Sequence, residues 1–298
     1  MQKWNMIVDV AKCENCNNCT LAVRDEHVGN DFPGYAAPQP AHGHDWIRIK
    51  RKVRGSVPMV DVAYLPTMCN QCDNAPCVRA GSDGSVYQRG DGIVIVDPRK
   101  AQGRRDIVNS CPYGAIWWNE SLQLPQKWIF EAHLLDQGWP EPRCTQACPT
   151  GSLRALRLEP SEMDDLAARE GLVVLHSEFG TKPRVYYKNL DRFMKCFVGG
   201  SVIASIDGVD ECVSDAVVKL FKKDKLISQT SSDEFGDFKF DGLQPASGAY
   251  TIRIMHNALG VAARDVHVED SLYLGVIELA ASFEKQIADR ALNSDNGS

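Results

Sequence analysis

Three cysteines near the N-terminus, each separated from the next by two residues, constrain this chain more than any other feature. They lie in the run Cys13-Glu14-Asn15-Cys16-Asn17-Asn18-Cys19. This spacing matches the first part of the Cys-x2-Cys-x2-Cys-x3-Cys-Pro pattern that binds an iron–sulfur cube. The pattern places a fourth cysteine at position 23, where this chain has Val23. A fourth ligand must therefore come from elsewhere in the chain.

A second block of three cysteines, within the run Cys69-Asn70-Gln71-Cys72-Asp73-Asn74-Ala75-Pro76-Cys77, is incomplete in the same way. Gly81 stands four residues after its last cysteine. Two later cysteines, Cys111 and Cys148, each begin the repeated sequence Cys-Pro-x-Gly. In two-cluster ferredoxins the cysteine before proline binds the cluster of the other motif. Sequential nesting of the motifs then pairs Cys111 with the second triplet and Cys148 with the first.

The sequence therefore predicts two 4Fe–4S clusters, each with four cysteine ligands. Cluster 1 is assigned Cys13, Cys16, Cys19 and Cys148, and cluster 2 is assigned Cys69, Cys72, Cys77 and Cys111. Zinc and redox-switch thiols are the alternatives. Structural zinc sites usually join two separated cysteine pairs, so dense thiolate triplets favour iron–sulfur cubes.

Cysteine usage and charge narrow the class of protein further. Nine of the 11 cysteines lie between positions 13 and 148, and the N-terminal residues lack the apolar run of a signal peptide. Such a chain is expected to be cytoplasmic and to use its thiols for metal rather than disulfides. The net charge of −6 and the lack of a long apolar run argue against nucleic-acid binding and membrane spanning. The basic run 48–54 is interpreted as a solvated strand face, with a strip that docks a partner as the alternative.

The pattern along the chain predicts an α+β protein with two domains. Residues 1–153 are expected to form a ferredoxin-like domain with both clusters. Residues 154–198 are expected to form a connecting or wrapping segment. This segment includes a helix that is expected to begin at the capping-box sequence Ser161-Glu162-Met163-Asp164. From 199 to 282 seven short alternating runs, separated by turn residues, predict an all-β sandwich. The tail 283–298 is expected to be largely disordered at its end. Cys196 and Cys212 have no ligand neighbours and are interpreted as free thiols.

With these residues identified, the chain resembles the iron–sulfur subunits of molybdopterin oxidoreductases over nearly its whole length. The resemblance is strongest to the branch of pyrogallol–phloroglucinol transhydroxylase small subunits and related resorcinol hydroxylases. It is carried by Cys13–Cys19, Asn74-Ala75-Pro76-Cys77, Asp91-Gly92-Ile93-Val94, Cys111-Pro112-Tyr113-Gly114, Ala132-His133-Leu134-Leu135-Asp136 and Gly180–Asn189. It implies that the C-terminal β-domain is of the prealbumin-like or Ig-like type, and its motif pairing agrees with the assignment above.

The resemblance also implies another cluster beside cluster 1, held by cysteines at four further positions. This chain has Val23, Trp128, Glu131 and Cys144 there, and we call these four positions the substituted site. One remaining cysteine cannot hold a cube, so the site is predicted to contain no metal. Trp128 is expected to fill the space, because core voids cost stability. Glu131 is expected either to face solvent or to meet a basic partner, since an unpaired buried carboxylate is costly.

The resemblance implies an electron-transfer subunit that is not itself catalytic. Its partner would be a large catalytic subunit with molybdenum bound to molybdopterin guanine dinucleotide, and the heterodimers could assemble further. The expected reaction is hydroxylation of a polyhydroxylated aromatic such as resorcinol. Alternatives are pyrogallol–phloroglucinol transhydroxylation, which needs no net electrons, a mainly structural docking subunit, and a free-standing polyferredoxin.

Overall fold

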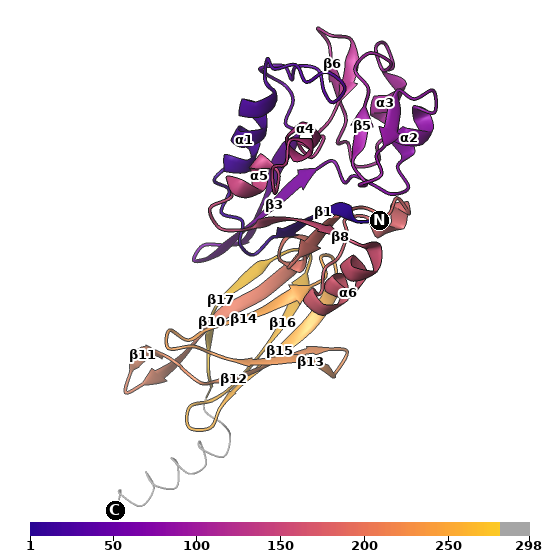
Figure 1. Ribbon diagram of the computed structural model, residues 1–298. Helices are drawn as coiled ribbons and strands as arrows, with labels where there is room; N and C mark the ends of the chain where they lie inside the picture. The colour runs from indigo at the N-terminus through magenta and orange to yellow at the C-terminus, as the bar shows by residue number, and fades with distance from the viewer. Residues whose placement is uncertain (281–298) are drawn as a thin grey trace, which may run out of the picture. The chain divides into compact units, whose positions relative to one another are not determined.

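The computed structural model describes residues 1–280 and divides the chain into two compact units (Figure 1). Unit 1 contains Met1–Arg51 and Ala63–Leu190, and unit 2 contains Lys52–Val62 and the chain from Asp191 onward. The last residues of the expected β-domain and the expected tail 283–298 lie outside the described residues. Within residues 1–280, no helix combines the length and apolar character that a membrane crossing requires.

A three-stranded sheet organises unit 1. Its central strand is β1 (Lys3–Asp9), which pairs antiparallel with β8 (Leu153–Leu158) and parallel with β9 (Val185–Lys188). Five consecutive residues of β1 are buried, as expected for a strand covered on both faces. Helix α6 (Pro160–Glu170) covers one face, where its apolar side chains pack against Ile7.

The segment expected to connect the domains contributes β8, α6 and β9 to unit 1 as far as Leu190. The helix expected to begin near Ser161 begins at Pro160, and its N-cap residue is Glu159, whose backbone N–H donates to Glu162 Oε2 at 2.9 Å. Pro160 at the first helical position explains this earlier start, since proline is preorganised for the first turn.

The remainder of unit 1 is built from short elements joined by long loops. The hairpins are β4 (Val86–Gln88) with β5 (Val94–Val96), and β6 (Trp117–Asn119) with β7 (Leu124–Gln126). The helices are α1 (Asn18–His27), α2 (Pro76–Ala80), α3 (Asp106–Asn109), α4 (Ala132–Asp136), α5 (Arg143–Gln146) and the 3₁₀ turn η1 (Ser177–Phe179). Helix α1 packs against α5, and α2 packs against α3.

One hairpin contributes residues to both units. It consists of β2 (Ile47–Ser56) and β3 (Met59–Met68), and its tip, Lys52–Val62, belongs to unit 2. The basic run lies on β2, and its exposed residues are Arg48, Lys50, Arg51 and the apolar Val53. Arg54 is the exception, because its side chain is fully buried.

Unit 2 contains two four-stranded sheets. One has β11 (Val209–Cys212), β10 (Cys196–Ile206) and β14 (Asp237–Leu243), with β17 (Leu272–Glu278) parallel to β10. The other has the order β13 (Lys225–Ser231), β12 (Val217–Lys222), β15 (Gly248–His256), β16 (Gly260–Val268). Both sheets contribute to one hydrophobic core, with Val202 and Phe240 from the first and Leu220 and Ile252 from the second.

All seven predicted runs are strands, which supports the α+β assignment. The sequence pattern missed β11, because its four residues are exposed and show no apolar alternation. Cys212 lies in that exposed strand, whereas Cys196 is buried and its thiol donates to the carbonyl of Leu243 at 3.3 Å. A short helix, α7 (Asp191–Met194), precedes β10.

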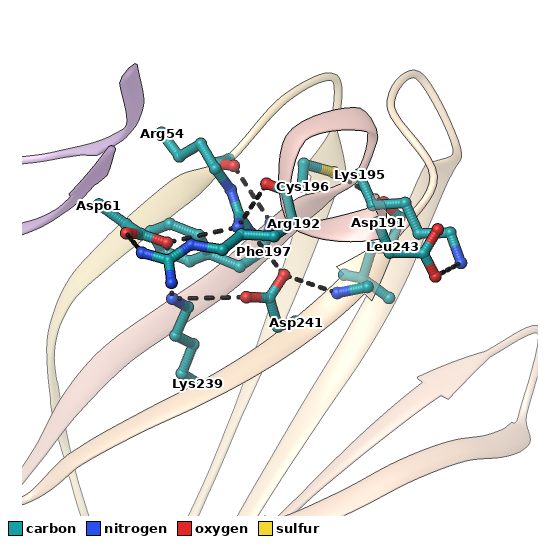
Figure 2. Close-up of polar contacts among 12 residues, drawn as sticks. Arg54, Asp61, Asp191, Arg192, Lys195, Cys196, Phe197, Lys239, Asp241 and Leu243 are labelled. Carbon is teal, nitrogen blue, oxygen red and sulfur yellow. Dashed lines mark hydrogen bonds and ion pairs between the residues drawn. The ribbon is translucent and has the colours of Figure 1, made fainter. Parts of the chain in front are cut away.

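A buried arginine joins the hairpin tip to the strands of unit 2 (Figure 2). Arg54 forms ion pairs with Asp61 and Asp241, donates to the carbonyl of Arg192 at 2.9 Å, and lies 5.3 Å from the centre of the Phe197 ring. Partial burial favours the neutral form of Asp241, but the hydrogen bond and charge of Arg54 outweigh it and lower the pKa of this carboxyl. The charge of Arg54 therefore compensates the carboxylates of both Asp61 and Asp241.

Arg54→Ala is expected to destabilise unit 2 by about 3 kcal/mol, because the two carboxylates would lose their buried partner. Hydrogen exchange at the amides of β10 and β14 would measure the loss. Arg192→Ala is the matched control: its side chain is 40% exposed and pairs with the same Asp61, so a change below about 1 kcal/mol is expected. Equal losses in the two variants would contradict this account.

The same pair predicts acid sensitivity in unit 2. Because the folded-state pKa of Asp241 lies below its usual value, its stabilisation is complete above the unfolded pKa and is lost as the pH falls through the folded pKa. Exchange protection of β14 should therefore decrease at acid pH in the wild type, and Arg54→Ala should show less of this decrease.

Candidate metal centre

The four cysteines assigned to cluster 2 line one cavity of unit 1. It has an empty volume of about 340 Å³, part of which opens to solvent. Its cysteine lining consists of Cys69, Cys72, Cys77 and Cys111. The structure thus brings together the second triplet and the first Cys-Pro cysteine.

The surroundings of this cavity are apolar, and this affects the protonation of its thiols. Burial raises the pKa of Cys72 to about 12 and that of Cys77 to about 11, and neighbouring thiols add repulsion between thiolates. The ammonium of Lys127 opposes the shift at Cys77. Four thiolates here need cations between them, which an iron–sulfur cluster supplies.

The cysteines assigned to cluster 1 also lie close to one another. Burial raises the pKa of Cys13, a backbone N–H of Asn15 opposes this, and the thiols of Cys148 and Cys16 raise it further. Burial raises the pKa of Cys19 to about 11, and Cys13 and Cys148 again contribute. Cys148 therefore lies beside the first triplet. Cys16 is exposed, so this group of thiols lies at the surface of unit 1.

Repeated left-handed residues shape the two cysteine loops. Asn15 has φ 56° immediately before Cys16, and Gln71 has φ 47° immediately before Cys72. Asparagine tolerates this region better than most residues. The glycines of the two Cys-Pro-x-Gly sequences share φ 63°. The internal repeat in the sequence is therefore also a repeat of backbone conformation.

No three His, Cys, Asp or Glu side chains in residues 1–280 converge closely enough to hold a single metal ion. A cube holds its four thiolates farther apart, because its own iron and sulfide ions lie between them. The two cysteine groups therefore suit a cluster rather than a single ion. His44, one of two histidines of the sequence His-x-His, contacts the carbonyl of Trp118 at 2.9 Å.

The substituted site is buried in unit 1. Its members Val23, Trp128, Glu131 and Cys144 are at most 1% exposed. The indole Nε1 of Trp128 donates to Glu131 Oε1 at 2.9 Å. Burial raises the pKa of Cys144 well above its usual value, and Glu131 and then Cys19 raise it further. Val23 and Cys144 lie on α1 and α5, which pack together, so the four positions share one region beside the first triplet.

The loop from Trp128 to Glu131 keeps the backbone of a cysteine loop. Phe130 has φ 61° immediately before position 131, as Asn15 and Gln71 do before their cysteines. A left-handed conformation is costly for phenylalanine, so local preference does not explain it. Packing explains it instead: the Phe130 ring lies 4.7 Å from that of Trp128, and Gln71 Nε2 donates to the carbonyl of Trp128 at 2.9 Å.

Glu131 follows neither of the two expected alternatives fully. It is completely buried, and its nearest basic group is His27, whose Nε2 lies 3.9 Å from Glu131 Oε1. Burial raises the pKa of Glu131 to about 8, although the Trp128 hydrogen bond lowers it, and burial reduces the pKa of His27 to about 3. Both groups are therefore largely neutral at pH 7. Sequence reasoning missed His27, although it lies four residues after Val23 on the same face of α1.

Trp128→Ala is expected to destabilise unit 1 by about 3–5 kcal/mol, because it removes a fully buried indole. All six tryptophans lie in unit 1, so the fluorescence of the other five follows its unfolding in urea. Trp139→Ala is the control: that residue is 40% exposed and should cost about 1 kcal/mol or less. Equal unfolding midpoints for the two variants would show that Trp128 does not fill the core.

Comparison with known proteins agrees with this geometry. The 4Fe-4S dicluster domain family matches residues 60–157. The small subunit of pyrogallol hydroxytransferase from Pelobacter acidigallici is 43% identical, over 94% of this chain and 100% of that protein. A tetrathionate reductase subunit from Salmonella typhimurium is 31% identical, over 63% of this chain and 73% of that protein.

This chain belongs to the family of iron–sulfur subunits of molybdenum oxidoreductases. The family also includes the arsenate respiratory reductase iron–sulfur subunit of Shewanella, which is 25% identical over 62% of this chain and 95% of that protein. The alignment with the pyrogallol hydroxytransferase small subunit extends through most of unit 2, since it spans 94% of the chain. As in other members of this family, the general role is electron transfer beside a larger catalytic partner.

Proposed function

We propose that this chain is the electron-transfer subunit of a heteromeric molybdenum hydroxylase that acts on polyhydroxylated aromatics such as resorcinol. In this proposal it carries two 4Fe–4S clusters, and its large partner binds molybdenum through molybdopterin guanine dinucleotide. The convergence of Cys69, Cys72, Cys77 and Cys111 on one cavity carries the proposal, together with family membership.

The residues of the chain fit these clusters in donor type and number. Each of the two cysteine groups supplies four sulfur donors, and each contains one cysteine contributed from far along the chain. When bound, such clusters are one-electron carriers. The protein would position them, with cluster 2 among apolar side chains such as Val94 and Ile116 and with the exposed Cys16 as one of the ligands of cluster 1.

The substituted site favours the hydroxylase within this branch. With three of four ligand positions changed, we propose that it holds no cluster, and this departure from the transhydroxylase pattern at the redox centres is why we favour the hydroxylase. A hydroxylase must export two electrons per turnover and could do so through one cluster. Pyrogallol–phloroglucinol transhydroxylation, which needs no net electrons, is the second candidate. The 43% identity to the pyrogallol hydroxytransferase small subunit favours this second candidate.

Counting iron and acid-labile sulfide in the purified complex tests the cluster assignment. About eight irons per copy of this chain are expected, beyond those of its partner, which is counted separately. About twelve would mean that Cys144 and non-cysteine ligands hold a third cube.

Adding aromatic substrates to the anaerobic complex then tests the reaction. Resorcinol should reduce the clusters in a hydroxylase, whereas pyrogallol should turn over without net reduction in a transhydroxylase. Clusters that stay oxidised while a hydroxylated product accumulates would indicate a mainly structural docking subunit. Purification as a monomer with full iron content would instead favour a free-standing polyferredoxin.

A further inference from the structure

The hydrogen-bonding capacity of several buried polar atoms beside the substituted site is unused, although the His27 ring itself packs against Phe32 and Trp46. Glu131 Oε2 and both ring nitrogens of His27 lack a hydrogen-bond partner among residues 1–280. Buried polar atoms are nearly always paired, and each exception costs stability. An apolar pair in the same space would have avoided this cost. The arrangement therefore suggests a function for these two side chains.

A series of contacts between polar side chains begins at the protein surface, on helices α1 and α5. Arg143 pairs with the exposed Asp25 at 2.9 Å and with the largely buried Glu26 at 2.7 Å. Glu26 Oε1 in turn lies 2.9 Å from Nε2 of His133, a buried residue of α4. These contacts lead from solvent to a buried imidazole.

From the His133 imidazole, this series of polar contacts continues inward to Glu131. The rings of His133 and His27 meet edge to face with centroids 5.4 Å apart. His27 Nε2 then lies 3.9 Å from Glu131 Oε1. Two imidazoles thus separate Glu131 from the carboxylate of Glu26. Small movements of these rings would complete a path for a proton.

Helix α1 places this path close to cluster 1. Cys19, Val23 and His27 follow one another at four-residue intervals on the same helix. At a rise of 1.5 Å per residue, His27 lies about 12 Å along the helix axis from Cys19. Glu131 lies beside His27, and at a separation of about 12 Å one added electron changes the proton affinity of a carboxylate by about tenfold at an effective dielectric constant near 20.

We propose that Glu131, with His27 beside it, is a proton-binding site that, at alkaline pH where its carboxylate is ionised, takes up one proton from solvent when one electron is added at cluster 1. The proposal rests on the proposed presence of cluster 1. The electron comes from the reduced partner subunit, or from dithionite in a titration. The proton forms an O–H bond on the Glu131 carboxylate, and the two imidazoles that pass it along return to their starting state.

The groups that face Glu131 make it suited to respond. Burial raises its pKa to about 8, Trp128 lowers it, and the more distant charges of Glu26 and Arg143 act in opposite directions. His27 is neutral because burial, followed by His133 and Arg143, lowers its pKa to about 3. The Cys144 thiol is also neutral at pH 7. The charge on cluster 1 is therefore the variable that changes the protonation of Glu131.

Redox titration of cluster 1 in the intact complex, followed by electron paramagnetic resonance from pH 6 to 10, tests the proposal. In the wild type the midpoint potential should be constant at low pH, fall as the pH rises through about 8, and level off above that. A tenfold change in proton affinity corresponds to a total fall of about 59 mV. Glu131→Gln keeps the shape and cannot titrate, so its potential should not depend on pH.

Glu120→Gln is the matched control, because it changes the same group at a position that is 75% exposed, and it should keep the wild-type profile. Redox-induced infrared difference spectra give a second measurement that needs no variant. A protonated carboxyl band, sensitive to deuterium oxide, should appear on reduction of the wild type above pH 8.

The outcomes separate this proposal from the proposed function. A complex with full iron content whose cluster 1 potential does not change with pH would overturn the proton site alone. The loss of pH dependence in Glu120→Gln as well as Glu131→Gln would also overturn it. A complex that lacks the iron and the signal of cluster 1 would overturn the proposed function together with the proton site.

Discussion

Replacing Cys148 with alanine is expected to remove one whole cluster and lower the iron content from about eight to about four per chain. Cys148 lies beside Cys13 and Cys19, and a cube with three thiolates at a partly exposed site is readily lost. Cys144→Ala, only four residues away, is expected to leave about eight irons. Cys144 lies among Trp128 and Glu131, which are not arranged to bind a cluster.

These two variants form a matched pair, because each removes one thiol from the same short stretch after α5 begins. Iron and sulfide counts, with the electron paramagnetic resonance spectrum of the reduced complex, measure the result. The remaining spectrum of Cys148→Ala should be that of cluster 2, and Cys111→Ala should leave the complementary one. An equal loss of iron in Cys144→Ala and Cys148→Ala would overturn the assignment of ligands.

The triple substitution Val23→Cys, Trp128→Cys and Glu131→Cys is expected to create a third cluster and raise the iron content to about twelve per chain. It restores four cysteines together with Cys144, and the loop from 128 to 131 already has the left-handed residue that precedes the cysteine in the two other motifs. Replacing Trp128 also removes the indole from the region that a cube would occupy.

Iron and sulfide counts after anaerobic reconstitution measure this gain. The control is Val23→Ser, Trp128→Ser and Glu131→Ser, which opens the same space without adding thiolates and should stay at about eight irons with lower stability. If the cysteine variant folds, as its tryptophan fluorescence would report, and still binds about eight irons, the backbone of this loop no longer supports a cluster.

Local patterns in the sequence predicted much of the fold. Alternating apolar residues identified seven strands of unit 2, because each strand has one face in the shared core. The exposed strand β11 has no such face and was missed. The pairing of β1 with β8 and β9 was also not predicted, since a strand buried on both faces carries no alternation to read.

The spacing of the cysteines and the repeated Cys-Pro sequences predicted how the site residues are grouped. The two incomplete triplets and the two Cys-Pro sequences left few ways to assemble sets of four, and the structure brings these cysteines together in the expected groups. The role of His27 could not be predicted in this way. A histidine eight residues after Cys19 becomes informative only when Glu131 and His133 are known to lie beside it.

The sequence by itself determined where thiols are grouped for metal binding and that three of the four substituted positions carry none, because the number and spacing of thiols limit what a loop of a few residues can enclose. Only the tertiary structure decided what surrounds the side chains at the substituted site. Trp128 is fully buried, and Glu131 lies in the interior beside His27 rather than in solvent. The protonation of these side chains depends on burial and on partners from three separate elements, and distances between such elements are set by packing rather than by local sequence.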